Sequence, residues 1–126
     1  MYEAGGAITS SPLLADGVAF FGSDDGNVSA VRLNNGRLLW EYDTGAMVQS
    51  QPSAWGDLVM VGNAAGTLFA LDRATGSRVW QYQTGGAITA GPAVYANFLL
   101  VGSLDRKLHA FEIETDGESD AGGANP

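Results

Sequence analysis

Short apolar segments separated by glycine-containing turns run along most of the chain, and the pattern recurs at an interval of 40 residues. The second segment of each repeat is continuously apolar, as in 58–61 (Leu-Val-Met-Val), which predicts a strand that is covered on both faces. Asp-Gly and Asn-Gly pairs separate the segments at hairpin spacing, because glycine supplies the positive φ angles of tight turns. No segment combines helical length with a 3.6-residue periodicity, so the pattern predicts an all-β fold.

Each repeat is predicted to hold four strands. Pro12, Pro52 and Pro92 are in phase and cannot donate a ladder hydrogen bond, so the first strand is expected at a sheet edge, innermost beside a channel. A four-strand period of about 40 residues is that of a propeller blade, in which antiparallel sheets stack face to face. The strands expected in the first repeat are 7–12, 18–23, 27–33 and 37–43.

The repeat divides the chain into three consecutive blades. Residues 6–45 and 46–85 are predicted to form complete four-stranded antiparallel blades, and residues 86–113 a third blade that lacks its outer strand. Residues 1–5 are in phase with the end of the fourth strand, so they are predicted to be a remnant of a preceding blade's outer strand. Residues 114–126 have no large apolar side chain and are predicted to form an acidic disordered tail.

A motif that ends in tryptophan closes each complete repeat. The second copy runs over residues 70–80 as Ala-Leu-Asp-Arg-Ala-Thr-Gly-Ser-Arg-Val-Trp, and the third copy starts at Ala110 but has no tryptophan. This frame resembles the PQQ-like (quinoprotein, tryptophan-docking) β-propeller repeats, over about residues 1–113. In that family the tryptophan stacks between the motif's alanine and the glycine peptide of the next blade. The residues expected by this resemblance to dock the blades are Ala30, Gly36, Trp40, Ala70, Asp72, Thr75, Gly76 and Trp80.

Few residues suggest catalytic chemistry. His109 is the only histidine and has no cysteine to share a metal with, so a plain strand position is expected. Asp24 and Asp25 are interpreted as turn residues rather than calcium ligands, because the second repeat has alanines in the same turn. Trp55 lies outside the motif in a predicted turn, where it is either a candidate partner contact or a cover for a blade edge. No catalytic, metal or cofactor-binding residue is predicted.

The charge and the termini limit the partners. The net charge is −8, and about half of it lies in the predicted tail, which leaves an acidic body that disfavours nucleic acid. No apolar run approaches the roughly 18 residues of a membrane helix, so membrane insertion is not expected. The N-terminus has no signal-peptide pattern, and the compartment stays open. The Asp-rich, Lys-poor composition suits a salt-adapted source, but ordinary soluble acidity is the favoured interpretation.

The resemblance leaves more than one function open. PQQ-like repeats occur in BamB, an outer-membrane assembly lipoprotein, which implies a non-catalytic scaffold that binds proteins in the periplasm or cell envelope and has no cofactor. They also occur in PQQ-dependent alcohol dehydrogenases, which hold PQQ with calcium under vicinal cysteines. The alternative is therefore a fragment of such an enzyme, with its cofactor site in absent blades, since this chain has no cysteine. A sensor or surface-layer repeat domain is a third hypothesis.

Three blades are fewer than the four or more that close a propeller. The sequence therefore allows two forms of the protein. The chain is either a piece of a longer propeller, or it associates with further copies of itself to complete the ring. In the second case the start of one copy would complete the third blade of another, and two copies would contribute six blades.

Overall fold

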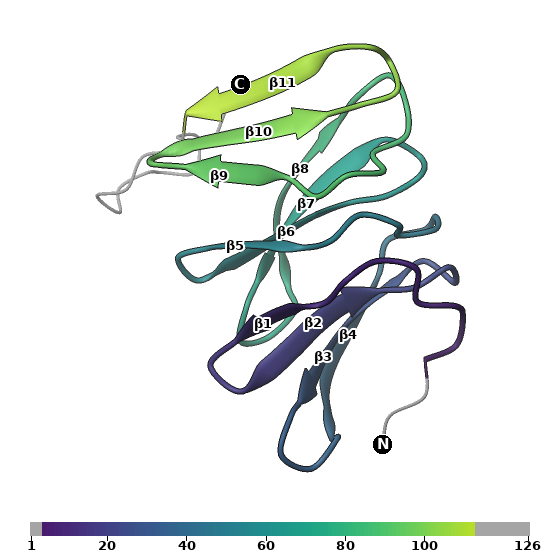
Figure 1. Cartoon of the computed structure of the whole chain (residues 1–126), viewed down its shortest axis with the longest axis vertical. Helices are drawn as coiled ribbons and strands as arrows, with labels where there is room; N and C mark the ends of the chain where they lie inside the picture. The colour runs from purple at the N-terminus through teal and green to yellow at the C-terminus, as the bar shows by residue number, and fades with distance from the viewer. Residues whose placement is uncertain (1–3, 113–126) are drawn as a thin grey trace.

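The computed structural model describes residues 4–112, and these form three antiparallel sheets stacked along the long axis of the molecule (Figure 1). Within this range, no helix is long and apolar enough to cross a membrane. The all-β fold predicted from the sequence is confirmed. The strands are β1 (Leu13–Ala15), β2 (Val18–Gly22), β3 (Asn27–Arg32), β4 (Leu38–Asp43), β5 (Ser53–Trp55), β6 (Leu58–Gly62), β7 (Thr67–Asp72), β8 (Arg78–Gln83), β9 (Ala93–Tyr95), β10 (Phe98–Gly102) and β11 (Leu108–Glu112).

The three sheets share one simple topology. The first sheet has the order β1-β2-β3-β4 and the second β5-β6-β7-β8, while β9, β10 and β11 form the third in the same up-and-down order. The strands β1, β5 and β9 lie against one another along one edge of the stack. Each sheet therefore presents its first strand toward a common line, as the inner strands of propeller blades do.

The first strand of each repeat begins later than the sequence predicted. Residues 7–12 form no strand, and β1 starts only after Pro12. The carbonyl groups of this segment are used outside the β1–β2 ladder: Ala7 accepts the Asp24 N–H over 2.8 Å, and Pro12 accepts Gln51 Nε2 over 3.2 Å. The turn position predicted for Trp55 is also wrong, because Trp55 is the last residue of β5.

Two of the predicted segments fall largely outside the described residues. Of the strand remnant predicted at residues 1–5, only Ala4 and Gly5 are described. The tail predicted at residues 114–126 lies wholly outside. The boundaries assigned to the blades from the repeat therefore stay predictions at both ends of the chain.

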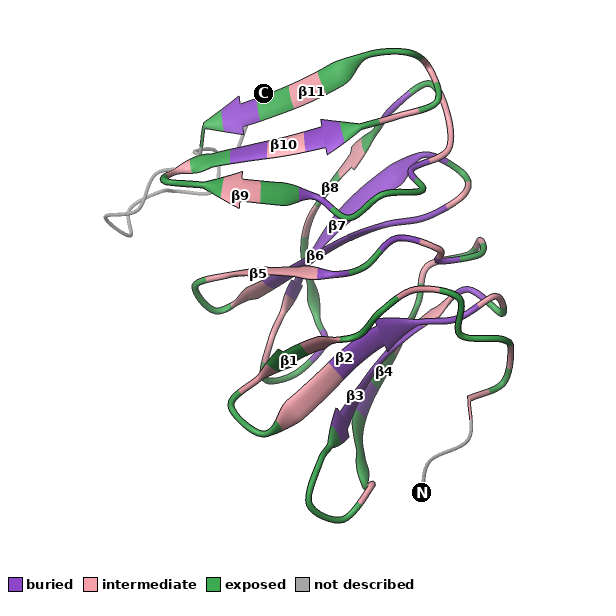
Figure 2. Ribbon diagram, viewed as in Figure 1, coloured by how far each residue is buried: buried purple, intermediate pink, exposed green. Residues whose placement is uncertain are grey.

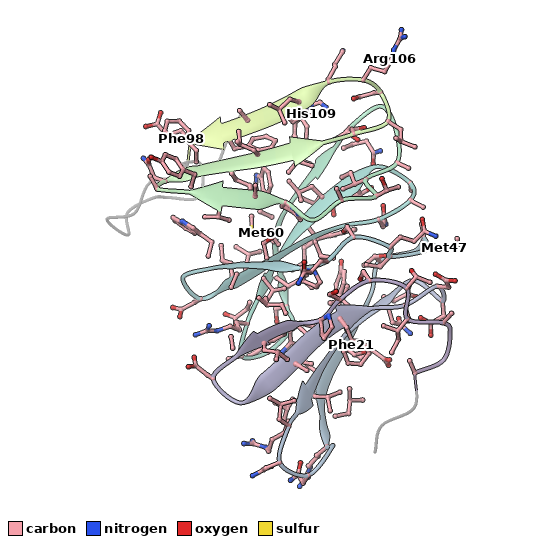
Figure 3. The ribbon with its side chains drawn as sticks, in the orientation of Figure 1. Phe21, Met47, Met60, Phe98, Arg106 and His109 are labelled. Atoms are coloured by element: carbon pink, nitrogen blue, oxygen red, sulfur yellow. The ribbon has the colours of Figure 1, made fainter. Side chains whose placement is uncertain are left out.

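The core lies between the sheets rather than within any one of them. Between the first and second sheets, Phe20, Val28 and Ala30 pack against Val59 and Leu71. Between the second and third sheets, the cluster of buried side chains consists of Met60, Leu68, Ala70, Ile88, Leu99, Val101 and Phe111. Figure 2 shows this burial along the middle strands, and Figure 3 shows Met60 in the space between the second and third sheets. Apolar side chains on both faces of these strands are buried between sheets, which explains why the strand sequences are continuously apolar.

Glycines at the ends of β2 and β6 let the linkers pack closely on the sheets. Val48 lies over Gly22, and Ile88 lies over Gly62, where an added Cβ would come within 2.7 Å of the Ile88 Cβ. Both linker side chains are fully buried. A side chain on either glycine would displace them, so the linker after each sheet is held against that sheet by an apolar side chain in a glycine notch.

Candidate functional site at the sheet junctions

Trp40 joins the first sheet to the second. It lies in β4 directly opposite Ala30 of β3, and it is only 8% exposed. Its indole Nε1 donates a hydrogen bond to the Arg73 carbonyl over 2.8 Å, and an added Cβ on Gly76 would lie 2.5 Å from the indole Cδ2. The indole is thus enclosed between an alanine of its own sheet and the β7–β8 turn of the next sheet, with its polar N–H satisfied.

The β7–β8 turn that receives the indole is shaped by its own side chains. Asp72 Oδ1 accepts hydrogen bonds from the N–H groups of Ala74, over 2.9 Å, and Thr75, over 3.1 Å. Gly76 follows with a φ of 79°, in the left-handed region that favours glycine. An aspartate that bonds backbone N–H groups two and three residues on is a standard way to stabilise a turn. Asp72, Thr75 and Gly76 therefore shape the surface on which Trp40 packs.

The second tryptophan of the repeat has a different environment. Trp80 lies opposite Ala70, as the register predicts, but it is half-buried, and its ring meets Phe111 of the third sheet edge-on with centroids 5.2 Å apart. The residues in phase with Arg73 and Gly76 are 113 and 116, outside the described residues. Of the predicted docking residues, the structure brings together Ala30, Trp40 and the 72–76 turn, and separately Ala70 and Trp80.

The turn of the first copy has no such partner among the described residues. Gly36 has a φ of 69°, as its counterpart Gly76 has. Arg32 stands in place of the aspartate, and Asn35 Oδ1 accepts the Arg37 N–H over 3.0 Å, as Thr75 Oγ1 accepts the Ser77 N–H in the second copy. The turn geometry is kept by the backbone bond from the Gly36 N–H to the Arg32 carbonyl over 2.9 Å, which matches the bond from Gly76 to Asp72.

A groove of about 440 Å³ lies beside the first junction. Arg73 crosses it to form an ion pair with Asp16, with 3.2 Å between Nη2 and Oδ2. Asp16 is largely exposed, so the pair contributes only about 0–1 kcal/mol. The groove is lined by Ala15, Asp16, Val18, Phe20, Leu39, Asp57, Asp72, Arg73 and Ala74.

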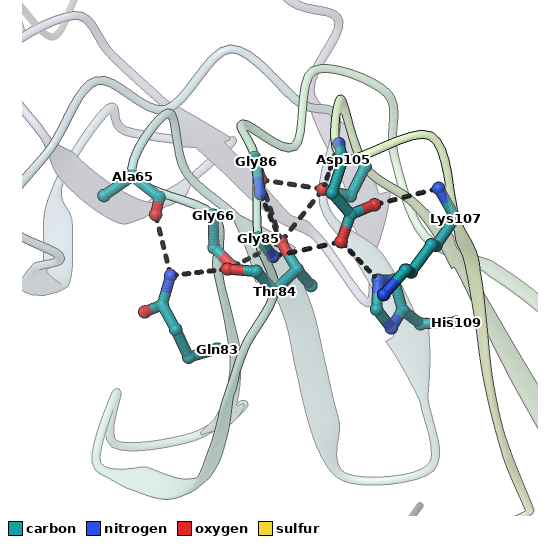
Figure 4. Close-up of polar contacts among 10 residues, drawn as sticks. Ala65, Gly66, Gln83, Thr84, Gly85, Gly86, Asp105, Lys107 and His109 are labelled. Carbon is teal, nitrogen blue, oxygen red and sulfur yellow. Dashed lines mark hydrogen bonds and ion pairs between the residues drawn. The ribbon is translucent and has the colours of Figure 1, made fainter.

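A polar network closes the second junction (Figure 4). Thr84, directly after β8, has its Oγ1 within 2.9 Å of the Gly66 carbonyl, 2.8 Å of the Gly86 carbonyl and 3.0 Å of the Ser103 hydroxyl. In the first repeat, Thr44 makes the corresponding bonds to the Gly26 and Ala46 carbonyls. The threonine that follows the outer strand of each complete repeat therefore ties that strand to the turn and the linker.

Asp105 is the charged centre of this network. It accepts hydrogen bonds from the Gly85 N–H over 3.0 Å and the Lys107 N–H over 2.9 Å, and it lies 3.0 Å from His109 Nε2. Desolvation raises the pKa of Asp105, but the bonds from Gly85, His109, Lys107 and Ser103 outweigh it and lower the pKa from 3.8 to about 2. His109 lies in β11, as predicted, and its ring also meets Tyr82 edge-on.

Aromatic side chains occupy the same repeat position in the second and third sheets. Trp55 ends β5 and Tyr95 ends β9, 40 residues apart, and the two strands lie against each other. Trp55 is half-buried against the second core cluster, whereas Tyr95 is 76% exposed. Tyr95 was not predicted as a contact residue, although its phase with Trp55 in the 40-residue repeat is a signal that identifies it.

The described residues do not fit a PQQ and calcium site. Within residues 4–112, no three His, Asp or Glu side chains gather as metal ligands. The whole chain has no cysteine to lie over the cofactor. No chemical step involving this cofactor can be assigned to the residues described.

Comparison with known proteins places the chain in a family. The family model described as "Outer membrane protein assembly factor BamB" matches residues 1–89. The crystal structure of BamB from Moraxella catarrhalis is 32% identical and superposes with a TM-score of 0.76 over 88% of this chain. The chain belongs to the BamB family of PQQ-like repeat proteins. The resemblance stated from the tryptophan motif is thereby confirmed.

The match covers a limited part of the relatives. The BamB-family chain spans 35% of the Moraxella protein. A quinohemoprotein alcohol dehydrogenase from Pseudomonas putida is 26% identical, with a TM-score of 0.72, over 80% of this chain and 17% of that one. The enzyme from Comamonas testosteroni, 24% identical over 91% of this chain and 21% of that one, has a TM-score of 0.72 and shares the fold. A search of curated proteins gives no match.

Proposed function

We propose that the chain is a non-catalytic, protein-binding scaffold of the cell envelope that takes part in outer-membrane protein assembly. The observation that carries the proposal is the match to BamB in sequence and in structure, since BamB is described as an outer membrane protein assembly factor. The junction geometry supports it, because Trp40 and Asp72 are already used in packing and in turn formation. In this proposal residues 6–45, 46–85 and 86–113 are successive blades, and the tryptophans dock them.

The proposed partner contact is the aromatic pair Trp55 and Tyr95. Tryptophan and tyrosine carry a large share of the energy at protein interfaces, because their rings bury much surface at little entropic cost. Tyr95 is well exposed, and it lies on a strand next to the one that ends in Trp55. A partner that covered both rings would contact two adjacent sheets at once.

Binding of the purified outer-membrane assembly complex from the organism that carries this chain tests the proposal. We expect the wild-type chain to bind, and Tyr95→Ala to bind about tenfold more weakly, as loss of an interface aromatic implies. Tyr95 is too exposed for its truncation to unfold the chain. Leu14→Ala, at another exposed position on a first strand, is the matched control and should bind as wild type does. Failure of the wild-type chain to bind would contradict the proposal.

The dehydrogenase hypothesis and the scaffold proposal predict different results in a second measurement, the melting temperature of the chain with PQQ and calcium added. The solved structure of the Pseudomonas enzyme, at 26% identity, is the observation that keeps it open. A specific ligand raises the melting temperature of the folded state that it binds. We expect PQQ with calcium to leave the melting temperature of the chain unchanged. A saturable rise of several degrees would overturn the non-catalytic assignment.

A further inference from the structure

The third sheet presents to solvent the face that the first two sheets bury. Leu108 is 68% exposed, whereas its counterparts Val28 and Leu68 are fully buried. Ala110 is likewise exposed, while Ala30 and Ala70 are buried. Phe98, on the same face, is also exposed, and Figure 3 shows it at the start of β10 in the last sheet of the stack. The outward face of the third sheet therefore has the residues of a sheet junction without the opposing sheet.

Gly102 indicates which kind of side chain can pack on this face. It is in phase with Gly22 and Gly62, on which Val48 and Ile88 lie. At Gly102, by contrast, no atom of residues 4–112 lies within 4 Å of an added Cβ, and the glycine is exposed. Within the described residues, the notch at Gly102 is thus open, and its size suits a valine or isoleucine.

The chain also contains an unused copy of the segment that fills such a notch. Residues 6–9, Gly-Ala-Ile-Thr, are identical to residues 86–89, whose Ile88 fills the notch at Gly62. Ile8 is 48% exposed, whereas Ile88 and Val48 are fully buried. An isoleucine in the right sequence context therefore lies exposed near one end of the stack, and an open notch lies at the other.

The backbone next to Gly102 has a carbonyl group that corresponds to the one which accepts the Ile88 N–H beside Gly62. The Asn63 carbonyl accepts hydrogen bonds from Gly66, over 3.1 Å, and from Ile88, over 3.0 Å. The corresponding carbonyl of Ser103 accepts the Arg106 N–H over 3.0 Å, and in the described part of the chain it has no second donor. The N–H of an isoleucine seated over Gly102 would supply that donor.

We propose that a second copy of this chain docks on the outward face of the third sheet and inserts its Ile8 over Gly102. Ile8 lies at one end of the stack and Gly102 at the other, so the contact is head-to-tail and can form twice between two copies, which closes a ring. This proposal concerns self-association and does not depend on the proposed role in outer-membrane assembly.

The mass of the full chain in solution, measured by light scattering on a gel-filtration column, tests the proposal. We expect a dimer of twice the 13.1 kDa chain mass. Gly102→Leu and Ile8→Asp should both be monomers with unchanged circular dichroism, because Gly102 has open space around it and Ile8 is exposed. Val79→Ala, exposed on the outer strand of the second sheet and outside the proposed contact, should remain a dimer.

Mixing the two blocked variants distinguishes this contact from other modes of association. The Ile8→Asp chain keeps an open notch and the Gly102→Leu chain keeps its isoleucine, so a mixture retains one of the two contacts. We expect the mixture to recover a dimer that neither variant forms alone. A wild-type chain that is monomeric at its highest soluble concentration would overturn the proposal, and would mean that the face accepts something else, such as a further blade. A dimer that persists in both variants would overturn it equally.

Discussion

Truncation of Trp40 to alanine is expected to lower the free energy of unfolding by about 3–5 kcal/mol, as for other buried tryptophans. The indole is almost fully buried, and it packs against Phe20 with ring centroids 5.9 Å apart. Its loss would leave a cavity between the first two sheets. It would also leave the Arg73 carbonyl without its indole donor. The unpaired carbonyl lowers the free energy of unfolding further where water cannot reach it.

Trp80→Ala is the matched control for this variant. Trp80 occupies the same repeat position but is half-buried, so its truncation should cost clearly less. Urea denaturation followed by circular dichroism measures both values. A loss below about 1 kcal/mol for Trp40→Ala, or a larger loss for Trp80→Ala, would contradict the packing described here.

Gly62→Ala is expected to destabilise the chain by about 1–3 kcal/mol, as overpacking of a core does. Even one added methyl group would collide with Ile88, which is fully buried and is confined by the second core cluster. Gly102→Ala changes the same repeat position in the third sheet, where the residues that the structure describes leave the space open. It should alter stability by no more than about 0.5 kcal/mol.

The two glycine variants are compared in the Ile8→Asp background, so that association between copies cannot contribute to the difference. Thermal and urea unfolding give the two free energies. Equal effects of the two substitutions would mean that Ile88 does not occupy the notch over Gly62. In that case the linker would not be held against the second sheet as the structure indicates.

The fold could be predicted largely from the 40-residue repeat. The strands predicted at 18–23 and 27–33 match β2 and β3 to within one residue, and the apolar run at 58–61 lies in β6, which is largely buried. The first strand could not be located in the same way. Val48 and Ile88 are β-branched and favour strands, yet they belong to linkers, because their packing on distant glycines outweighs local propensity.

The candidate site could be predicted only in part. The resemblance pointed to Trp40 and Gly76 together, since both belong to the repeat motif. The hydrogen bond from Trp40 to the Arg73 carbonyl was not predictable, because a backbone acceptor 33 residues away leaves no trace in side-chain identity. The low pKa of Asp105 depends on backbone N–H groups of the neighbouring linker, which are equally invisible in the sequence.

Hydrogen exchange of the tryptophan indoles in ¹⁵N-labelled protein tests the central claim of a docked sheet junction most directly. Of the chain's three tryptophans, Trp40 alone has a hydrogen-bond partner for its indole N–H among residues 4–112. Its indole proton should therefore exchange with D₂O far more slowly than those of Trp55 and Trp80, because exchange requires opening of the junction. Exchange of the Trp40 indole as fast as that of the other two would contradict the docking of Trp40 on the β7–β8 turn.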